Sequence, residues 1–245
     1  MHGAGSSADF WHLQQGAFPL AYYVNLPGHG SREPGATSKE PLEELSSIVH
    51  RPSSIAGYAD WLAEYIERNG LERVVLAGHS MGGAVALELA LRQPDWLRGL
   101  VLTCAGARYP VSARLMELLR DDYEAAVDFI LARSFGPHEG ALTYKQKAVR
   151  YGTRRQMLRT PPEVVMSDYE ACAEFDVEDR LSEITAPTLV IAGGEDRVTP
   201  PTLSRELHRE IKGSLLFIVE GAGHMLPMER PNEYNGAVER FLTNQ

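Results

Sequence analysis

The chain has 245 residues, 44% of them hydrophobic, and a formal net charge of −9 at pH 7. This negative charge argues against nucleic acid and against an anionic membrane surface as partners. The length and the apolar content suit one large α/β domain, and no apolar stretch reaches the ~20 residues that a membrane-spanning helix needs.

Strand and helix patterns alternate in the first part of the chain. Residues 21–25 predict a strand, and an apolar residue at every third or fourth position predicts a helix over 53–69. Apolar runs at 73–77 and 100–104 predict two further buried strands. This alternation is typical of an α/β fold, in which a mostly parallel open sheet is flanked by helices.

The pentapeptide Gly78-His79-Ser80-Met81-Gly82 is the most informative motif of the chain. It stands between the apolar run that ends at Ala77 and an Ala/Leu-rich run over 83–90, so it occupies a strand-to-helix turn. Such a turn strains the backbone of the central serine and raises its Oγ at the positive end of a helix. The motif therefore predicts a nucleophile elbow with Ser80 as the nucleophile, the alternative being an ordinary glycine-rich turn.

The alternation stops between Ala107 and Ile184. Helical stretches are predicted over 111–119, 124–134 and 143–151, and prolines at 110, 137, 161 and 162 separate them. Some large apolar side chains here are candidates for a substrate pocket, with core packing as the preferred alternative: Met116, Phe129, Met157, Met166 and Phe175.

Charge is uneven within this insertion. A basic run contains Lys145, Lys147, Arg150, Arg154, Arg155 and Arg159. An acidic cluster follows, with Glu163, Asp168, Glu170, Glu174, Asp176, Glu178 and Asp179. The basic run could attract a carboxylate-bearing substrate, but we prefer the interpretation that both groups form solvated helix faces that pair with each other.

Two buried strands near the end of the chain present an acid and a histidine. The run at 188–192 leads into a loop with Glu195 and Asp196, and the run at 215–219 leads into a loop that ends at His224. Open α/β sheets place their sites just beyond the carboxyl ends of the strands. We therefore expect Ser80, one of the two carboxylates and His224 to meet there.

Together these motifs resemble the α/β-hydrolase fold enzymes of the esterase and C–C hydrolase type. The matching pieces cover most of the chain: His2-Gly3-Ala4-Gly5 with Trp11, Leu26-Pro27-Gly28-His29-Gly30, Gly78-His79-Ser80-Met81-Gly82-Gly83, Ala186-Pro187-Thr188-Leu189-Val190, Gly194-Glu195-Asp196 and Gly221-Ala222-Gly223-His224. The chain order of serine, acid and histidine is also that of the family.

The resemblance implies a role for each member of a catalytic triad. Ser80 is expected to be the nucleophile, His224 the base and Asp196, rather than Glu195, the acid. His79 and His29 are expected to be structural. The resemblance also implies that residues 1–106 and 185–245 form the core domain and that 107–184 form a helical cap over the serine.

An oxyanion hole needs two N–H donors. One is expected from Met81, the residue after the nucleophile, and the resemblance gives the other to Ala4. In the family the His-Gly motif follows a strand, whereas only Met1 precedes His2 here. We therefore expect an interruption of the sheet between 21–25 and 73–77 and a natural protein that starts further upstream, the alternative being a sheet that closes up.

The sequence predicts a serine hydrolase that cleaves a small carboxylic ester through an acyl-enzyme. A C–C bond hydrolase of the same fold and a ligand receptor on this scaffold are the alternatives, since both could keep the triad. No phosphate-binding, dinucleotide, zinc-protease or EF-hand motif occurs, so we expect neither a metal nor a cofactor. The two cysteines and the lack of a signal-peptide pattern favour the cytoplasm. We expect a monomer or a homodimer.

Overall fold

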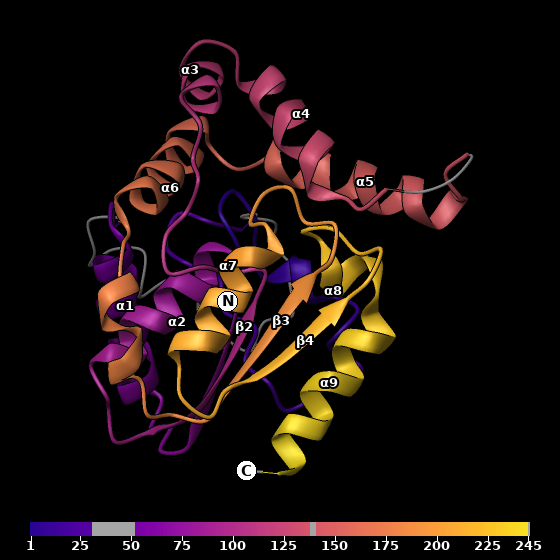
Figure 1. The fold of residues 1–245 in the computed structure, drawn as a ribbon. Helices are drawn as coiled ribbons and strands as arrows, with labels where there is room; N and C mark the ends of the chain where they lie inside the picture. Colours follow the sequence, from indigo (N-terminus) through magenta and orange to yellow (C-terminus); the bar gives the residue numbers. More distant parts are fainter. Residues whose placement is uncertain (31–51, 138–140, 245) are drawn as a thin grey trace.

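The computed structural model describes residues 1–30, 52–137 and 141–244. Its centre is a parallel sheet in the order β1-β2-β3-β4 (Figure 1). The four strands confirm the buried runs of the sequence: β1 (Val74–His79), β2 (Leu97–Thr103), β3 (Thr188–Gly193) and β4 (Leu215–Val219).

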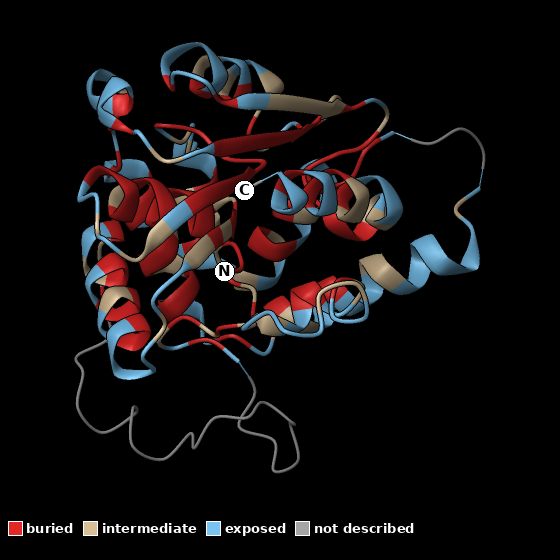
Figure 2. Ribbon diagram, turned by 90° about the horizontal axis from the view of Figure 1, so that it is seen from below, coloured by how far each residue is buried: buried red, intermediate tan, exposed pale blue. Residues whose placement is uncertain are grey.

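Helices cover both faces of the sheet. One face carries α1 (Ile55–Arg68), α2 (Met81–Leu91) and α7 (Pro201–Glu210), and the other carries the 3-10 helix η1 (Ala8–Trp11), α8 (Leu226–Glu229) and α9 (Pro231–Thr243). Successive strand residues point to opposite faces, so Leu100 and Leu102 join the first apolar cluster and Val101 joins the second. The inner strands β2 and β3 are accordingly mostly buried, the outer strands β1 and β4 are only partly buried, and the outer helix faces are exposed (Figure 2).

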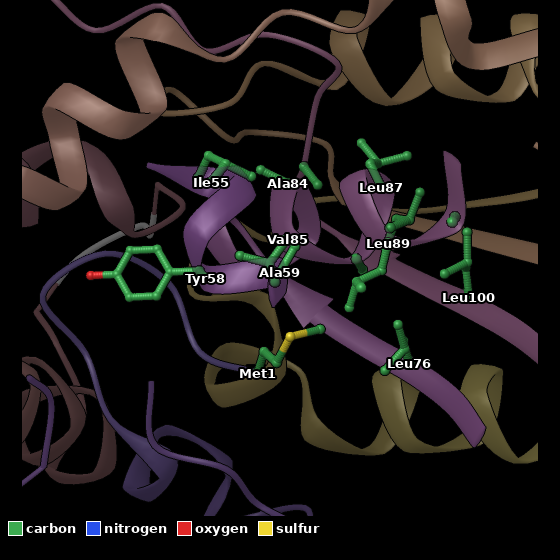
Figure 3. Packing of buried hydrophobic residues seen from close by; sticks show 14 of the residues in the cluster. Met1, Ile55, Tyr58, Ala59, Leu76, Ala84, Val85, Leu87, Leu89 and Leu100 are labelled. Atoms are coloured by element: carbon green, nitrogen blue, oxygen red, sulfur yellow. The ribbon is translucent and has the colours of Figure 1, made fainter. Parts of the chain in front are cut away.

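The helix predicted over 53–69 is α1, and its packing follows from its sequence. Ser54 caps its first turn, because the Ser54 hydroxyl accepts the N–H of Gly57 at 3.1 Å. Ala59 and the other buried apolar side chains of α1 belong to one cluster with Val85 of α2 and Leu76 of β1 (Figure 3). The same cluster contains the side chain of Met1.

Four helices form a layer above the carboxyl ends of the strands (Figure 1). They are α3 (Ala113–Asp121), α4 (Tyr123–Ser134), α5 (Tyr144–Met157) and α6 (Pro162–Glu174), and we call them the helical layer. The 3-10 helix η2 (Glu178–Glu183) leads from the layer back to β3. The layer has its own apolar cluster, to which Leu119, Val127 and Val165 belong.

The first three helices of the layer confirm the expectation from the sequence, whereas α6 was not expected. The prolines at 161 and 162 favoured a break there. Pro162 instead occupies the first turn of α6, where the N–H that proline lacks would have no partner in any case. Half-buried Arg154 of the basic run lies 2.7 Å from Asp128 and 3.2 Å from Glu124 of α4, so its partners here are not in the acidic cluster that was expected to pair with it.

The free edge of β1 shows where the expectation for residues 21–25 was wrong. Those residues form no strand. The Met1 amine and carbonyl bond to Ala77 O at 2.7 Å and to His79 N–H at 3.1 Å, beside the end of β1. A groove of about 600 Å³ separates the rest of this edge from residues 21–25. Residues 20–24 and 70–77 are among those that line it. Residues 21–25 therefore pair with none of the four strands in the described part of the chain.

No helix within the described ranges is at once long and apolar enough to cross a membrane.

Leu100 of β2 provides a test of this core. Its side chain is fully buried, so Leu100→Ala should lower the free energy of unfolding by about 2–5 kcal/mol through lost burial and a residual cavity. Leu215→Ala in β4 is the matched control, because Leu215 is 57% exposed and its loss should change stability by less than about 1 kcal/mol. Urea denaturation measures both, and equal losses would contradict the layering described here.

Candidate active site

The turn between β1 and α2 holds Ser80 in a strained conformation. Its φ of 52° and ψ of −121° lie in a region that side-chain-bearing residues rarely adopt. A Cβ on Gly78 would lie 2.2 Å from the carbonyl oxygen of Gly82, so only glycine fits where the turn closes on itself. Ser80 N–H donates to Thr103 O of β2 at 3.0 Å, which fixes the turn to the neighbouring strand.

The carbonyl of Ser80 is fixed as well. It accepts the N–H of Gly83 at 2.7 Å, and the hydroxyl of Tyr109 donates to it at 2.7 Å. Both backbone polar groups of the strained residue are therefore satisfied, and the turn is held from the helix, the sheet and the segment that leaves β2.

His224 and Asp196 meet beyond the ends of β4 and β3. His224 Nδ1 lies 2.8 Å from Asp196 Oδ2, and both side chains are buried. Asp196 Oδ1 accepts the N–H groups of Val198 at 2.8 Å and Thr199 at 2.9 Å. Of the two carboxylates that the sequence presents in this loop, Asp196 contacts His224, whereas Glu195 is exposed.

The surroundings of Asp196 favour its ionised form. Burial alone would raise the pKa of this carboxyl, but the charge and the hydrogen bond of His224, together with the bonds from Thr199, outweigh burial and hold the pKa below its usual range. An ionised Asp196 accepts a hydrogen bond from the N–H at His224 Nδ1, and in this tautomer of the neutral ring Nε2 carries no proton.

Ser80 and His224 line the same small pocket. Its volume is about 30 Å³, and the helical layer closes it with Ile130, Met157 and Tyr169. Its other lining residues are Gly3, Ala4, Ser6, Phe10, His79, Ser134, Thr153, Val198 and Met225. No Lys, Arg, Asp or Glu is among them, and of the five apolar candidates from the sequence only Met157 lines it.

The two residues expected to donate to an oxyanion both lie close to Ser80. Met81 follows it directly, and Ala4 lines the pocket. Within the described part of the chain, neither backbone N–H is bonded to a protein acceptor. A Cβ on Gly3 would lie 3.1 Å from that of Ser80, so the segment before Ala4 runs directly beside the serine.

His79 joins the turn to the loop of His224. His79 Nε2 lies 2.8 Å from the carbonyl oxygen of His224, to which it donates, and the ring stacks on Phe10 at a centroid distance of 4.5 Å. Burial, followed by the charge of His224, lowers the pKa of His79 to about 3. Its ring is therefore neutral near pH 7 and holds the loop as a hydrogen-bond donor.

Two buried residues near the site were not expected from the sequence. Thr199 Oγ1 lies 2.8 Å from Asp196 Oδ2 and 3.1 Å from His224 Nδ1. Asp168 was expected on a solvated helix face, yet it is fully buried and contacts His29 Nε2 at 2.7 Å. The helical spacing of Val164, Val165 and Asp168 contains the signal, because it places the acid on the apolar face of α6.

Among the described residues, His79, Cys104 and His224 form one group whose ligand atoms lie within 4.8 Å of one another, as a metal site would require. One ring nitrogen of each histidine already makes a hydrogen bond within the protein: His79 Nε2 donates to a backbone carbonyl, and His224 Nδ1 donates to Asp196. The arrangement is thus better suited to proton transfer at His224 than to metal binding.

The buried neutral His79 should make the protein sensitive to acid. Its pKa of about 3 in the folded state lies below the ordinary value of 6.5, so between these pH values the unfolded chain binds a proton that the folded chain excludes. Stability should therefore fall as the pH drops from 6.5 toward 3, by at most about 1.4 kcal/mol per pH unit from this residue.

Urea denaturation at pH 7, 6, 5 and 4 measures this effect. His79→Gln, which removes the titrating ring, should show a shallower decline than the unmodified protein. His12→Gln at an exposed position is the control and should keep the original slope. Equal slopes for all three proteins would contradict a neutral buried His79.

Comparisons with known proteins show which family this chain belongs to. A model of the alpha/beta hydrolase family matches residues 1–237. The pimeloyl-[acyl-carrier protein] methyl ester esterase of Neisseria meningitidis serogroup B is 28% identical over 91% of this chain and 84% of its own length. A putative carbamate hydrolase RutD of Caulobacter sp. is 27% identical over 99% of this chain and 89% of its own length.

A solved structure agrees as well. That of a thermophilic esterase superposes with a TM-score of 0.79 at 33% identity, over 99% of this chain and 88% of that one. The chain therefore belongs to the alpha/beta hydrolase family and is a hydrolase.

Proposed function

We propose that this hydrolase cleaves small carboxylic esters, with Ser80 as the nucleophile, His224 as the general base and Asp196 as the acid that orients His224. The proposal rests above all on the 2.8 Å contact between His224 Nδ1 and Asp196 Oδ2, made by a histidine that lines the same pocket as Ser80. The strained turn supports it further, because it presents the serine in that pocket and leaves its backbone fully bonded.

The reaction begins when Ser80 Oγ attacks the ester carbonyl. His224 Nε2 takes the hydroxyl proton and then passes it to the leaving alcohol. Asp196 stays ionised throughout, fixes the proton on Nδ1 and stabilises the imidazolium that forms. Water, activated by the same histidine, then releases the acid from the acyl-enzyme.

The developing oxyanion needs donors that are already in place. In our proposal these are the backbone N–H groups of Met81 and Ala4, each worth about 10²- to 10³-fold in rate. Met81 begins α2, so the positive end of that helix points at the same oxygen.

The helical layer serves as the cap of this enzyme, with residues 107–184 as the cap and 1–106 and 185–245 as the core. A cap that excludes water strengthens every electrostatic interaction at the oxyanion. The uncharged lining of the pocket supports an uncharged acyl group, and the esterases among the relatives support an ester as the scissile bond. The acidic chain and its two buried free cysteines support a cytoplasmic enzyme.

Ser80→Ala should abolish turnover of p-nitrophenyl acetate and labelling by a fluorophosphonate probe, with an unchanged melting temperature, because the change removes the nucleophile and only one small atom. Ser134→Ala is the matched control, since Ser134 lines the same pocket but donates to Ile130 O of its own helix. That variant should keep the label. A labelled Ser80→Ala protein, or an unmodified protein that binds esters without turnover as a receptor would, refutes the proposal.

Asp196→Asn and Glu195→Gln separate the two carboxylates of the loop. The first should lower kcat by about 10⁴-fold, because the amide no longer holds the required tautomer of His224. The second changes an exposed side chain and should leave kcat within a factor of about two. Steady-state kinetics with p-nitrophenyl butyrate measure both, and the reverse ranking would assign the role to Glu195.

A further inference from the structure

The helical layer holds the segment that carries Ala4. Gly5 N–H donates to Asp168 Oδ2 of α6 at 2.8 Å, and Thr160 Oγ1 donates to Gly5 O at 3.2 Å. Both backbone polar groups of the residue after Ala4 are thus bonded to side chains that lie more than one hundred positions away in the chain.

Gly5 also fits tightly against the layer. Its φ of 63° is a conformation that suits glycine, and a Cβ there would lie 3.3 Å from Met157 and from Val165. Because Gly5 has no side chain, its backbone can lie closer to the helical layer than that of a larger residue could.

Asp168 is itself held in one position. In addition to Gly5 N–H, Oδ2 contacts His29 Nε2 at 2.7 Å, and Oδ1 accepts the hydroxyl of Tyr58 at 2.9 Å. The ring of Tyr58 lies at the edge of the core cluster, and its hydroxyl points away from that cluster (Figure 3). A fully buried carboxylate is stable only while such donors satisfy it, so these contacts fix where Asp168 can place Gly5.

We propose that Asp168 is a positioning residue, which aligns the Ala4 N–H for the oxyanion by holding Gly5. The proposal rests on the function proposed above, in which Ala4 is an oxyanion donor. Ala4 lies between Gly3, which runs beside Ser80, and Gly5, which Asp168 holds. Asp168 therefore fixes the end of this short segment that lies away from the nucleophile. Loss of the anchor lets the Ala4 peptide turn away from the reacting carbonyl.

The same helix also shapes the pocket. Tyr169, the neighbour of Asp168 in α6, lines the pocket beside Ser80. A movement of α6 therefore changes the pocket wall and the oxyanion segment together. The position of the helical layer thereby determines whether a bound ester finds a complete set of oxyanion donors.

Asp168→Ala tests this role through kinetics. We expect kcat for p-nitrophenyl acetate to fall by at least about tenfold, toward the 10²- to 10³-fold loss typical of one oxyanion donor. KM should change by less than about threefold, since the interaction acts in the transition state. Asp168→Asn keeps an oxygen that can accept Gly5 N–H and should restore most of the rate. Glu170→Ala, at an exposed position of the same helix, is the matched control.

The thionoester analogue of the same substrate distinguishes alignment from general damage. Its sulfur is a weaker acceptor than oxygen, so the preference for the oxygen ester measures how well the donors are placed. This preference should shrink in Asp168→Ala and stay unchanged in Glu170→Ala. A structural role without alignment would slow both esters equally and leave the ratio as it was.

Hydrogen exchange provides a readout that needs no turnover. Amides of residues 3–6 should exchange faster in Asp168→Ala, while those of β3 keep their protection. An unmodified protein without ester turnover would refute the proposed function, and exchange would still decide whether Asp168 holds the segment. Unchanged exchange in a folded Asp168→Ala protein overturns the inference. If that variant does not fold, Asp168→Ser takes its place, because its shorter side chain no longer reaches Gly5 N–H, and unchanged exchange there overturns the inference equally.

Discussion

The turn around Ser80 depends on a contact that leaves no room for a side chain. Gly78 and Gly82 approach so closely that a single methyl group would collide with a carbonyl oxygen. That contact holds Ser80 in a strained conformation, which costs about 1–3 kcal/mol and which the residue would otherwise leave. The remaining parts of the site take their positions from this turn, because His79 beside the serine donates to the backbone of the His224 loop.

Much of the fold could be predicted because its signals are local. Buried strands such as β3 are short apolar runs, and the turn before α2 has its own motif. The segment 21–25 has a similar local pattern, yet a strand exists only where a partner lies within hydrogen-bond reach, and here a groove lies in between. Helix α6 was missed for the opposite reason, since Pro162 suits its first turn although proline usually ends a helix.

The site also combines features that local sequence patterns predict with features that they do not. The meeting of Asp196 and His224 could be predicted, because both residues follow strands of one parallel sheet. The contact of Asp168 with Gly5 could not, because nothing local relates two residues that lie 163 positions apart. Only the packing of the helical layer on the core brings them together. Long-range contacts of this kind determine alignment, and local motifs determine which groups are present.

The size of the pocket has a consequence for how affinity would be measured. A volume of about 30 Å³ holds one or two water molecules and no ester, so an ester can bind only after the lining of the pocket has moved to an open arrangement. An observed dissociation constant then equals the intrinsic one divided by the fraction of molecules that are open. In the proposed mechanism, contacts that hold the helical layer down weaken apparent binding while they protect the acyl-enzyme from bulk water. Discrimination between two esters then depends partly on how strongly each of them stabilises the molecules whose pocket is open.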